Sequence, residues 1–432
     1  MSQPITPGIG ASGIAGLAIE VLPPPEQNAP APTGVGGTLD DGTYRYYISA
    51  TNAAGETTLS DVEVVVTSGG DTSSVTVSWN EVADATGYNI YRTDVDGAAG
   101  TQLLLDSVVG GDTLLYVDDG SESPSGAFPT ASTAYNAGTY TAPTKFFPFM
   151  SEGLMTPQET VWRRPIRQTA DILGAVPGNF HMEGDMSIEA LEDVVLYFLC
   201  ASRTDITRTG SSPNFTYEIV PTPAAITPRT LSITLVRNGV VFGYTGVTLS
   251  SFTFNVSDGL LMFDVSLMGR DEAVQAVPTP TWPTSTPFGA GMYSIEFPTG
   301  TPVVDTDTFE WTVEDNAEPQ FRLKTPSRGA QFIKYGERNS TMSAERDFDN
   351  RTDYDNFKAL TSQTVTISAT RTANNSITLL APVAIKDSYE VTAPGQGDLV
   401  RASISYQHVI DDTGKSWQVT IETQEELTIE NA

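Results

Sequence analysis

The sequence predicts a mainly β protein: two tandem β-sandwich or barrel domains, each with one short helix, and a further inserted β-sandwich. Glycine (37) and proline (28) are frequent among short Thr/Val/Ser-rich runs, a mixture typical of short strands joined by turns. Linker-like stretches set one segment apart from the remainder. Outside that segment, two halves of the chain repeat one order of elements.

Composition divides the 432 residues into five segments. Residues 27–135 hold 15 acidic side chains, two arginines and no lysine, between Pro-rich and Ser/Gly/Pro-rich flanks. This contrast predicts an independently folding insert. The other segments are an N-terminal arm with the first strand of domain 1 (1–26), the continuation of domain 1 (136–274), a Pro/Thr-rich linker or arm (275–303) and domain 2 (304–432).

The insert alternates as strands at 44–52, 75–79, 87–92 and 114–118. These residues resemble a fibronectin type III domain, with Trp79, Tyr88 and Tyr91 in its core. The hairpin pattern that begins at Tyr46 and ends at Gly55 precedes the Trp strand, whereas the family has the opposite order. The resemblance therefore implies a circularly permuted member or a related immunoglobulin-like sandwich.

The two halves outside the insert each read as a strand, a helix and further strands. In the first, strand 180–186 leads to Ser187 as an N-cap and a helix with its apolar face from Ile188 to Leu199. Strands at 231–236, 240–244, 252–256 and 260–268 follow, with Asn-Gly and Asp-Gly turns. The second half repeats this order, with a helix opened by Thr352 and Asp355 as a capping box, and strands at 341–346, 364–371, 376–380, 388–392, 398–407 and 416–423.

Several strands alternate between an apolar and a polar face, as expected for an antiparallel sheet with one side in water. The apolar faces run along 261–267, 400–406 and 417–421. The polar side chains that we expect to share one wet surface are Asp264, Ser266, Arg401, Ser403, Ser405, Gln418, Thr420, Glu422, Glu183 and Asp185.

The pieces 16–20 and 141–149 look like one sequence split by the insert. Together with the strand Met182–Asp185 before a helix and the pattern from Gly246 to Gly269, they resemble major tail tube proteins of long-tailed, siphovirus-like phages. The resemblance implies a structural virion protein, not an enzyme, whose rings stack into a channel for DNA passage. The insert would then be a decoration domain on the outside of the tube.

The resemblance also implies partners. These are further copies of the chain, as a homotrimeric pseudo-hexameric ring or alternatively a homohexamer, the tape measure protein, and tail terminator and baseplate proteins. Double-stranded DNA would pass without specific binding along a lumen lined by the polar residues above. The protein would be made soluble in the host cytoplasm and end in the virion tail, with no cofactor, metal or membrane contact.

The net charge of −30 argues against tight nucleic-acid binding, because such a surface repels phosphates. Two other functions stay open: a baseplate or adhesin-type protein that binds host glycans through the insert, and an extracellular carbohydrate-active enzyme. For the latter, Glu183 and Asp185 lie two apart on one strand face and could mimic a catalytic carboxylate pair. Solvated strand residues are the favoured interpretation.

Overall fold

The structure is a computed structural model that describes residues 13–130, 132–136, 138, 140–164, 171–222, 229–322, 328–348, 351–393, 395 and 399–427. Residues 1–12 of the predicted N-terminal arm lie outside this range. The chain forms two compact units, one of residues 20–139 and one of residues 1–19 with 140–432. Both are built from strands, and the described residues contain two short helices, which confirms the mainly β fold class.

The unit of residues 20–139 consists of two sheets around one core. One sheet has the order β2–β6–β9, and in the other β3 pairs with β4, β5 and β7, and β7 with β8. In the core, the rings of Trp79 and Tyr88 pack 5.1 Å apart, and the Tyr46 hydroxyl donates to buried Asp118 (2.6 Å). The strands are β2 (Ala31–Thr33), β3 (Gly42–Asn52), β4 (Gly55–Glu56), β5 (Glu63–Thr67), β6 (Ser74–Ser78), β7 (Gly87–Arg92), β8 (Leu103–Val109) and β9 (Leu115–Asp118).

The two ends of this unit lie next to each other. Val21 and Tyr135 form a bridge, and the Leu22 N–H donates to the Ala134 carbonyl (2.8 Å). In the other unit, β1 (Gly13–Ile19) pairs antiparallel with β10 (Lys145–Phe147). The insertion therefore interrupts the connection between two paired strands, where a chain can leave and return with little disturbance.

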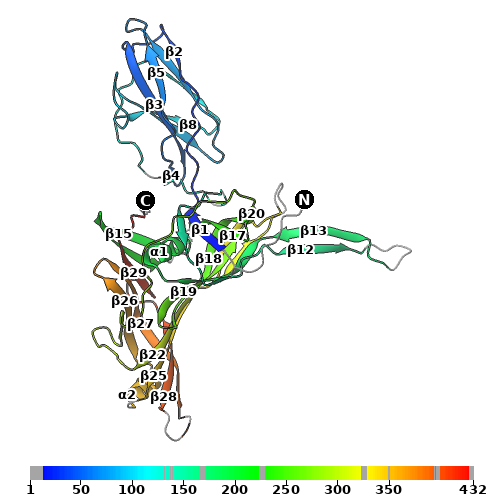
Figure 1. The fold of residues 1–432 in the computed structure, drawn as a ribbon, viewed down its shortest axis with the longest axis vertical. Helices are drawn as coiled ribbons and strands as arrows, with labels where there is room; N and C mark the ends of the chain where they lie inside the picture. Colours follow the sequence, from blue (N-terminus) through cyan, green and yellow to red (C-terminus); the bar gives the residue numbers. More distant parts are fainter. Residues whose placement is uncertain are drawn as a thin grey trace. The chain divides into compact units, whose positions relative to one another are not determined.

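The larger unit contains a long sheet in which β19, β18, β22, β25 and β28 lie side by side (Figure 1). The β12–β13 hairpin extends away from it as an arm (Figure 1). The remaining elements are β11 (Ser151–Glu152), β12 (Gln158–Arg163), β13 (Gly174–Phe180), β14 (Met182–Glu189), α1 (Glu192–Cys200), β15 (Thr204–Ser211), β16 (Asn214–Pro221), β17 (Leu231–Arg237), β18 (Val240–Ser257), β19 (Leu260–Gly269), β20 (Asp271–Ala273), β21 (Tyr293–Glu296), β22 (Thr306–Glu314), β23 (Ala317–Gln320), β24 (Phe332–Tyr335), β25 (Asn339–Asp347), α2 (Thr352–Lys358), β26 (Ser362–Thr372), β27 (Asn375–Thr392), β28 (Arg401–His408) and β29 (Gln418–Thr423).

Two runs of elements in this unit repeat each other, apart from the β15–β16 hairpin, which lies between α1 and β17 and has no counterpart between α2 and β26. We call β14–α1–β17–β18–β19 repeat 1 and β25–α2–β26–β27–β28 repeat 2. In each, the last strand pairs with the first, and the two long strands β18 and β27 both span 18 residues. The register shifts between Leu231 and Ile233 opposite β18, and between Gln363 and Val365 opposite β27. Because bulges are specific local features, their recurrence at matching places marks a structural repeat.

A second bulge strengthens the match between the repeats. On β18 it falls between Leu249 and Ser251, where β18 faces β19. On β27 it falls between Lys386 and Ser388, where β27 faces β28. Ser251 follows the bulge on β18 and Ser388 follows the bulge on β27, so these two serines occupy matching positions. This alignment allows positions of one repeat to be compared with positions of the other.

The helices depart from the predicted pattern. Ser187 does not cap α1, because Met186 and Ile188 continue the alternation of β14 and are buried in its pairing with β19. The helix begins at Glu192 instead. Thr352 does not cap α2 either: the N-cap is Arg351, without a side-chain capping bond. Every residue of α1 except Tyr197 is buried, whereas α2 buries none.

Two of the strands are longer than the sequence patterns suggested. The separate strands predicted at 240–244 and 252–256 are one continuous strand, β18, and those at 376–380 and 388–392 are one strand, β27. Bulges rather than loops absorb the change in alternation. The predicted Asn238-Gly239 and Asp258-Gly259 turns are confirmed, with φ of 49° and 80° and of 52° and 79°.

Candidate functional site

The predicted polar residues fall on the outer face of the long sheet. On β19, Asp264 and Ser266 lie next to the partly or largely exposed Glu183 and Asp185 of β14. The opposite face is apolar and closed: Phe263 is fully buried. The alternation of the sequence thus places one polar and one apolar surface on the same strands.

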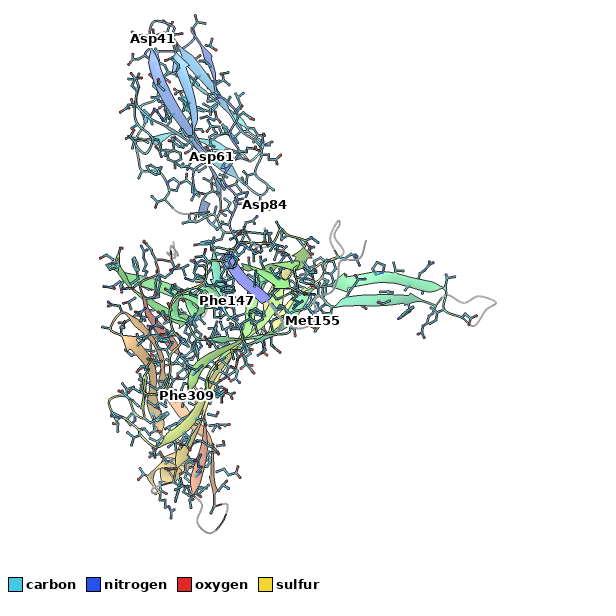
Figure 2. The ribbon with its side chains drawn as sticks, in the orientation of Figure 1. Asp41, Asp61, Asp84, Phe147, Met155 and Phe309 are labelled. Atoms are coloured by element: carbon cyan, nitrogen blue, oxygen red, sulfur yellow. The ribbon has the colours of Figure 1, made fainter. Side chains whose placement is uncertain are left out.

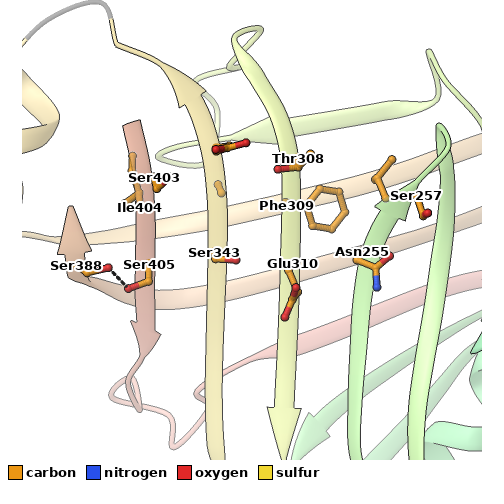
Figure 3. Close-up of a pocket in the computed structure, with 13 residues that line it drawn as sticks. Asn255, Ser257, Thr308, Phe309, Glu310, Ser343, Ser388, Ser403, Ile404 and Ser405 are labelled. Carbon is orange, nitrogen blue, oxygen red and sulfur yellow. Dashed lines mark hydrogen bonds between the residues drawn. The ribbon is translucent and has the colours of Figure 1, made fainter. Parts of the chain in front are cut away.

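The same arrangement recurs in repeat 2. Ser403 and Ser405 on β28 lie beside Ser343 on β25 and Ser388 on β27. The hydroxyls of Ser388 and Ser405 are 2.6 Å apart (Figure 3). In the aligned registers, these positions correspond to Asp264, Ser266, Asp185 and Ser251 of repeat 1.

A groove lies over each of these matching positions. The groove of repeat 2 has a volume of about 570 Å³ and is open to solvent (Figure 3). That of repeat 1 has about 380 Å³. The first is lined by Asn255, Val256, Ser257, Thr308, Phe309, Glu310, Ser343, Ala344, Glu345, Ser388, Ser403, Ile404 and Ser405, and the second by Ser151, Glu152, Gly153, Asp185, Met186, Ser187, Ser251, Thr253, Asp264, Val265 and Ser266.

Strand β22 joins the two repeats into one surface. It pairs with β18 on one side and β25 on the other, and the hydroxyls of Thr253 and Thr312 meet at 2.9 Å across the first pairing. The sequence shows this strand through the alternation of Phe309, Trp311 and Val313, all buried, but the predicted elements did not include it.

The polar side chains of this surface hydrogen-bond to each other across the strands. The Ser266 hydroxyl donates to Asp185 (2.6 Å), and the Asn255 amide donates to Asp264 (2.5 Å). Arg401, the cation among the predicted residues, pairs with Asp307. The arrangement is a polar, partly exposed surface with acidic groups, on which Arg401 is paired with the carboxylate of Asp307.

Three of the predicted residues are located elsewhere. Gln418, Thr420 and Glu422 lie on β29, which pairs with β16 and with the first half of β27. Arg401, Ser403 and Ser405 lie on β28, which pairs with β25 and with the second half of β27. The remaining members lie on β14 and β19. The structure therefore brings Glu183, Asp185, Asp264, Ser266, Arg401, Ser403 and Ser405 onto one connected sheet surface and leaves the β29 residues on another.

Catalytic and metal-binding alternatives find little support in the geometry. Glu183 contacts His181 (3.0 Å), and Asp185 accepts a hydrogen bond from Ser266. Each carboxylate is therefore bound to a neighbouring side chain. His408 is buried, its Nδ1 lies 2.7 Å from the Ser340 hydroxyl, and burial lowers its pKa to about 3. Among the described residues, no three His, Cys, Asp or Glu side chains form a group that could hold a metal ion.

Neither helix has the length and apolar composition needed to cross a membrane, as far as the described residues go.

Acidic side chains are spread over the surface of residues 20–139: Asp41, Asp61 and Asp84 are exposed at separate places (Figure 2).

The described residues form a mainly β chain whose long sheet is polar on one face and apolar on the other. A family model for phage tail tube proteins matches residues 130–407, more than half of the chain. The chain belongs to this family of phage tail tube proteins. A search of curated proteins returned no match. Membership implies a structural role, self-assembly into a tube and a location in the virion tail.

Proposed function

We propose that the chain is the major tail tube subunit of a siphovirus-like phage, and that three copies form a ring of six similar domains. The observation that carries this proposal is the repeat of strand pairing and of both bulges in β14–β19 and β25–β28. A duplicated subunit halves the number of chains that a six-domain ring requires. A ring of six chains is the alternative.

The polar surface over the two grooves is proposed to face the lumen of the tube. Apart from Arg401, which is paired with Asp307, its polar side chains are Ser, Thr, Asn and acids, including exposed Asp185 and Glu310. Such a surface offers transiting double-stranded DNA few cationic contacts, so DNA could move without binding. The tape measure protein would occupy the same channel, and tail terminator and baseplate proteins would contact the ends of the tube.

Residues 20–139 are proposed to be a permuted fibronectin type III-like decoration domain. A three-stranded and a five-stranded sheet around one core support this assignment. The adjacent ends at Leu22 and Ala134 fit an insertion that leaves the tube domain intact. Replacing residues 20–139 with a short Gly/Ser loop should therefore preserve tube formation in electron micrographs. Loss of tubes in a folded variant would show that the insert is needed for assembly.

Cysteine labelling of assembled tubes tests the lumen assignment. In the variant Ser403→Cys, a small maleimide should react in tubes and a maleimide on a large polymer should not. The control Val109→Cys, at a position that is 89% exposed in the insert, should react with both reagents. Cys200 is buried and its pKa is raised to about 12 by burial, so it contributes little background. Reaction of Ser403→Cys with the large reagent would contradict the assignment.

A further inference from the structure

The chain contains one complete junction between repeats. Residues Phe252–Asn255 of β18 pair antiparallel with Glu310–Val313 of β22, the strand that precedes repeat 2. The Asp315 N–H donates to the Ser250 carbonyl (2.7 Å) at the end of this pairing. Since hydrogen-bonded pairs alternate along an antiparallel ladder, Phe254 and Trp311 form such a pair, and Thr253 and Thr312 form the intervening one. We call this pairing the internal junction.

Both partners of the internal junction have counterparts in the other repeat. The counterpart of β18 is β27, so that Phe254 corresponds to Val391. The counterpart of β22 is the segment 150–156. Met155 in this segment pairs with Glu183 of β14, and Thr312 in β22 pairs with Thr341, the residue of β25 that matches Glu183. The hairpins β12–β13 and β23–β24 then follow in matching order.

These two counterparts lie at opposite ends of the long sheet and do not meet within the chain. Among the described strands, β28 alone pairs with Lys386–Thr392. The segment 153–156 pairs with β14 on one edge, and no described strand pairs with its other, outer edge. Both carry exposed apolar side chains: Val391 is 42% and Met155 56% exposed, whereas Phe254 at the internal junction is fully buried.

We propose that Tyr389–Thr392 of one copy pairs antiparallel with Gly153–Thr156 of a second copy, with Val391 opposite Leu154 and Glu390 opposite Met155. This inference rests on the proposed ring and specifies the contact that closes it. It reproduces the register of the internal junction, so every junction around three copies would be alike. The two outer sheet edges would pair with each other, which removes a site for uncontrolled pairing.

In the single chain, side chains cap the edge at Leu154. Its N–H donates to the Glu152 carboxylate (3.1 Å) and its carbonyl accepts from Arg237 (2.6 Å). Gly153 and Met155 direct their N–H groups to β14, so the N–H and the carbonyl of Leu154 point to the outer edge. Arg237 also binds Glu152 (2.7 Å) and holds the pKa of that carboxyl below its usual range.

The cap is absent where the pairing already exists. In the aligned registers, Glu152 corresponds to Phe309 and Arg237 to Ala369, neither of which can bind a backbone edge through a charge. At this place β22, which precedes repeat 2, pairs with β18, whereas the segment that precedes repeat 1 carries the cap. Val391 of the second copy would take over the hydrogen bonds that Glu152 and Arg237 make to Leu154.

Disulfide formation in assembled tubes tests the register. The pair Glu390→Cys and Met155→Cys sits at the position of closest approach, where the Cα atoms of such a pair are about 4.5 Å apart, a distance that suits a disulfide. Oxidation should link chains into products of up to three copies on non-reducing gels. The matched control is Thr253→Cys with Thr312→Cys, at the same position of the internal junction, which should link within one chain.

A shifted pair distinguishes this register from general proximity. Ser151→Cys with Glu390→Cys displaces one partner by four residues, about 13 Å along a strand, and should give roughly tenfold less linked product. Two results would overturn the inference and leave the proposed function intact, provided that tubes form normally. One is a disulfide in the control Thr253/Thr312 pair but none in the Met155/Glu390 pair, and the other is equal linking in the Met155/Glu390 pair and the shifted pair. Protein that stays monomeric in electron micrographs would instead overturn the proposed function.

Discussion

A buried carboxylate fastens the internal junction, and its removal is a sharp test of how the two repeats hold together. Asp315 follows β22 and is 2% exposed. It accepts from the Ser202 hydroxyl (2.8 Å) and from Arg203 Nη2 (3.0 Å), both just after α1 in the chain. It also accepts from Arg338 Nε (2.7 Å), just before β25. One side chain thus connects elements of both repeats.

The substitution Asp315→Asn keeps the shape of this side chain and removes its charge. The side chains of Arg203 and Arg338 are 18% and 13% exposed, so two largely buried guanidinium groups would lose their counter-charge. Breaking a buried pair costs roughly 3–5 kcal/mol. Arg203 keeps a bond to the Gly336 carbonyl (3.2 Å) and both arginines keep some solvent, so the expected loss is about 3 kcal/mol.

Urea unfolding followed by tryptophan fluorescence measures this loss, with buried Trp311 and Trp417 reporting on the larger unit. The matched control is Asp355→Asn, whose partner Arg351 and own side chain are 77% and 60% exposed. It should change the free energy of unfolding by less than about 0.5 kcal/mol. A loss below about 1 kcal/mol for Asp315→Asn, with an unchanged slope, would refute the claim that this carboxylate fastens the repeats.

Two further substitutions test burial and close approach. The neutral, buried His408 has its pKa lowered to about 3, so the unfolded chain takes up its proton first as the pH falls below about 6.5. When the pH is lowered from 7.5 to 5.5, the free energy of unfolding of the unchanged protein should fall by about 1.4 kcal/mol more than that of the variant His408→Gln. Equal slopes of the free energy of unfolding against pH for the two proteins would contradict this. A Cβ at Gly184 would lie 2.4 Å from the Gly153 carbonyl oxygen, so Gly184→Ala should lower stability by about 2 kcal/mol and weaken tube assembly. Gly239→Ala has open space at φ +80° and should cost only about 1 kcal/mol; an equal effect of both would remove the steric explanation.

The parts of the fold that the sequence predicted are those determined by local chemistry. Alternation along 261–267 predicted which side chains are buried, because a strand side chain has only two faces available. The Asn238-Gly239 and Asp258-Gly259 turns were predicted because both residues of such a turn need positive φ. The repeated order of elements was also visible, since it depends on spacing rather than on residue identity.

The parts that were not predicted depend on contacts between distant segments. Ser187 has the chemistry of a helix cap, but the pairing of β14 with β19 extends the strand past it and moves the helix start to Glu192. The β15–β16 hairpin over 204–221 was not among the predicted strands, although Phe215, Tyr217 and Ile219 alternate as buried residues. Its burial depends on the pairing of β16 with β29, some 200 residues away in sequence.

Joining two repeats in one chain allows them to differ where a single repeated chain could not. Repeat 1 has an almost fully buried helix that is apolar after Glu192 and Asp193, and repeat 2 has a helix with no buried residue, in which Asp353 pairs with Lys386 (2.5 Å). Only the β1–β10 connection before repeat 1 carries the insert. In the part of the chain that the structure describes, the Glu152–Arg237 cap lies at the edge before repeat 1, and the matching place before repeat 2 carries no such cap. In the proposed ring, half of the junctions are therefore formed when the chain folds, and the capped half form only when copies meet.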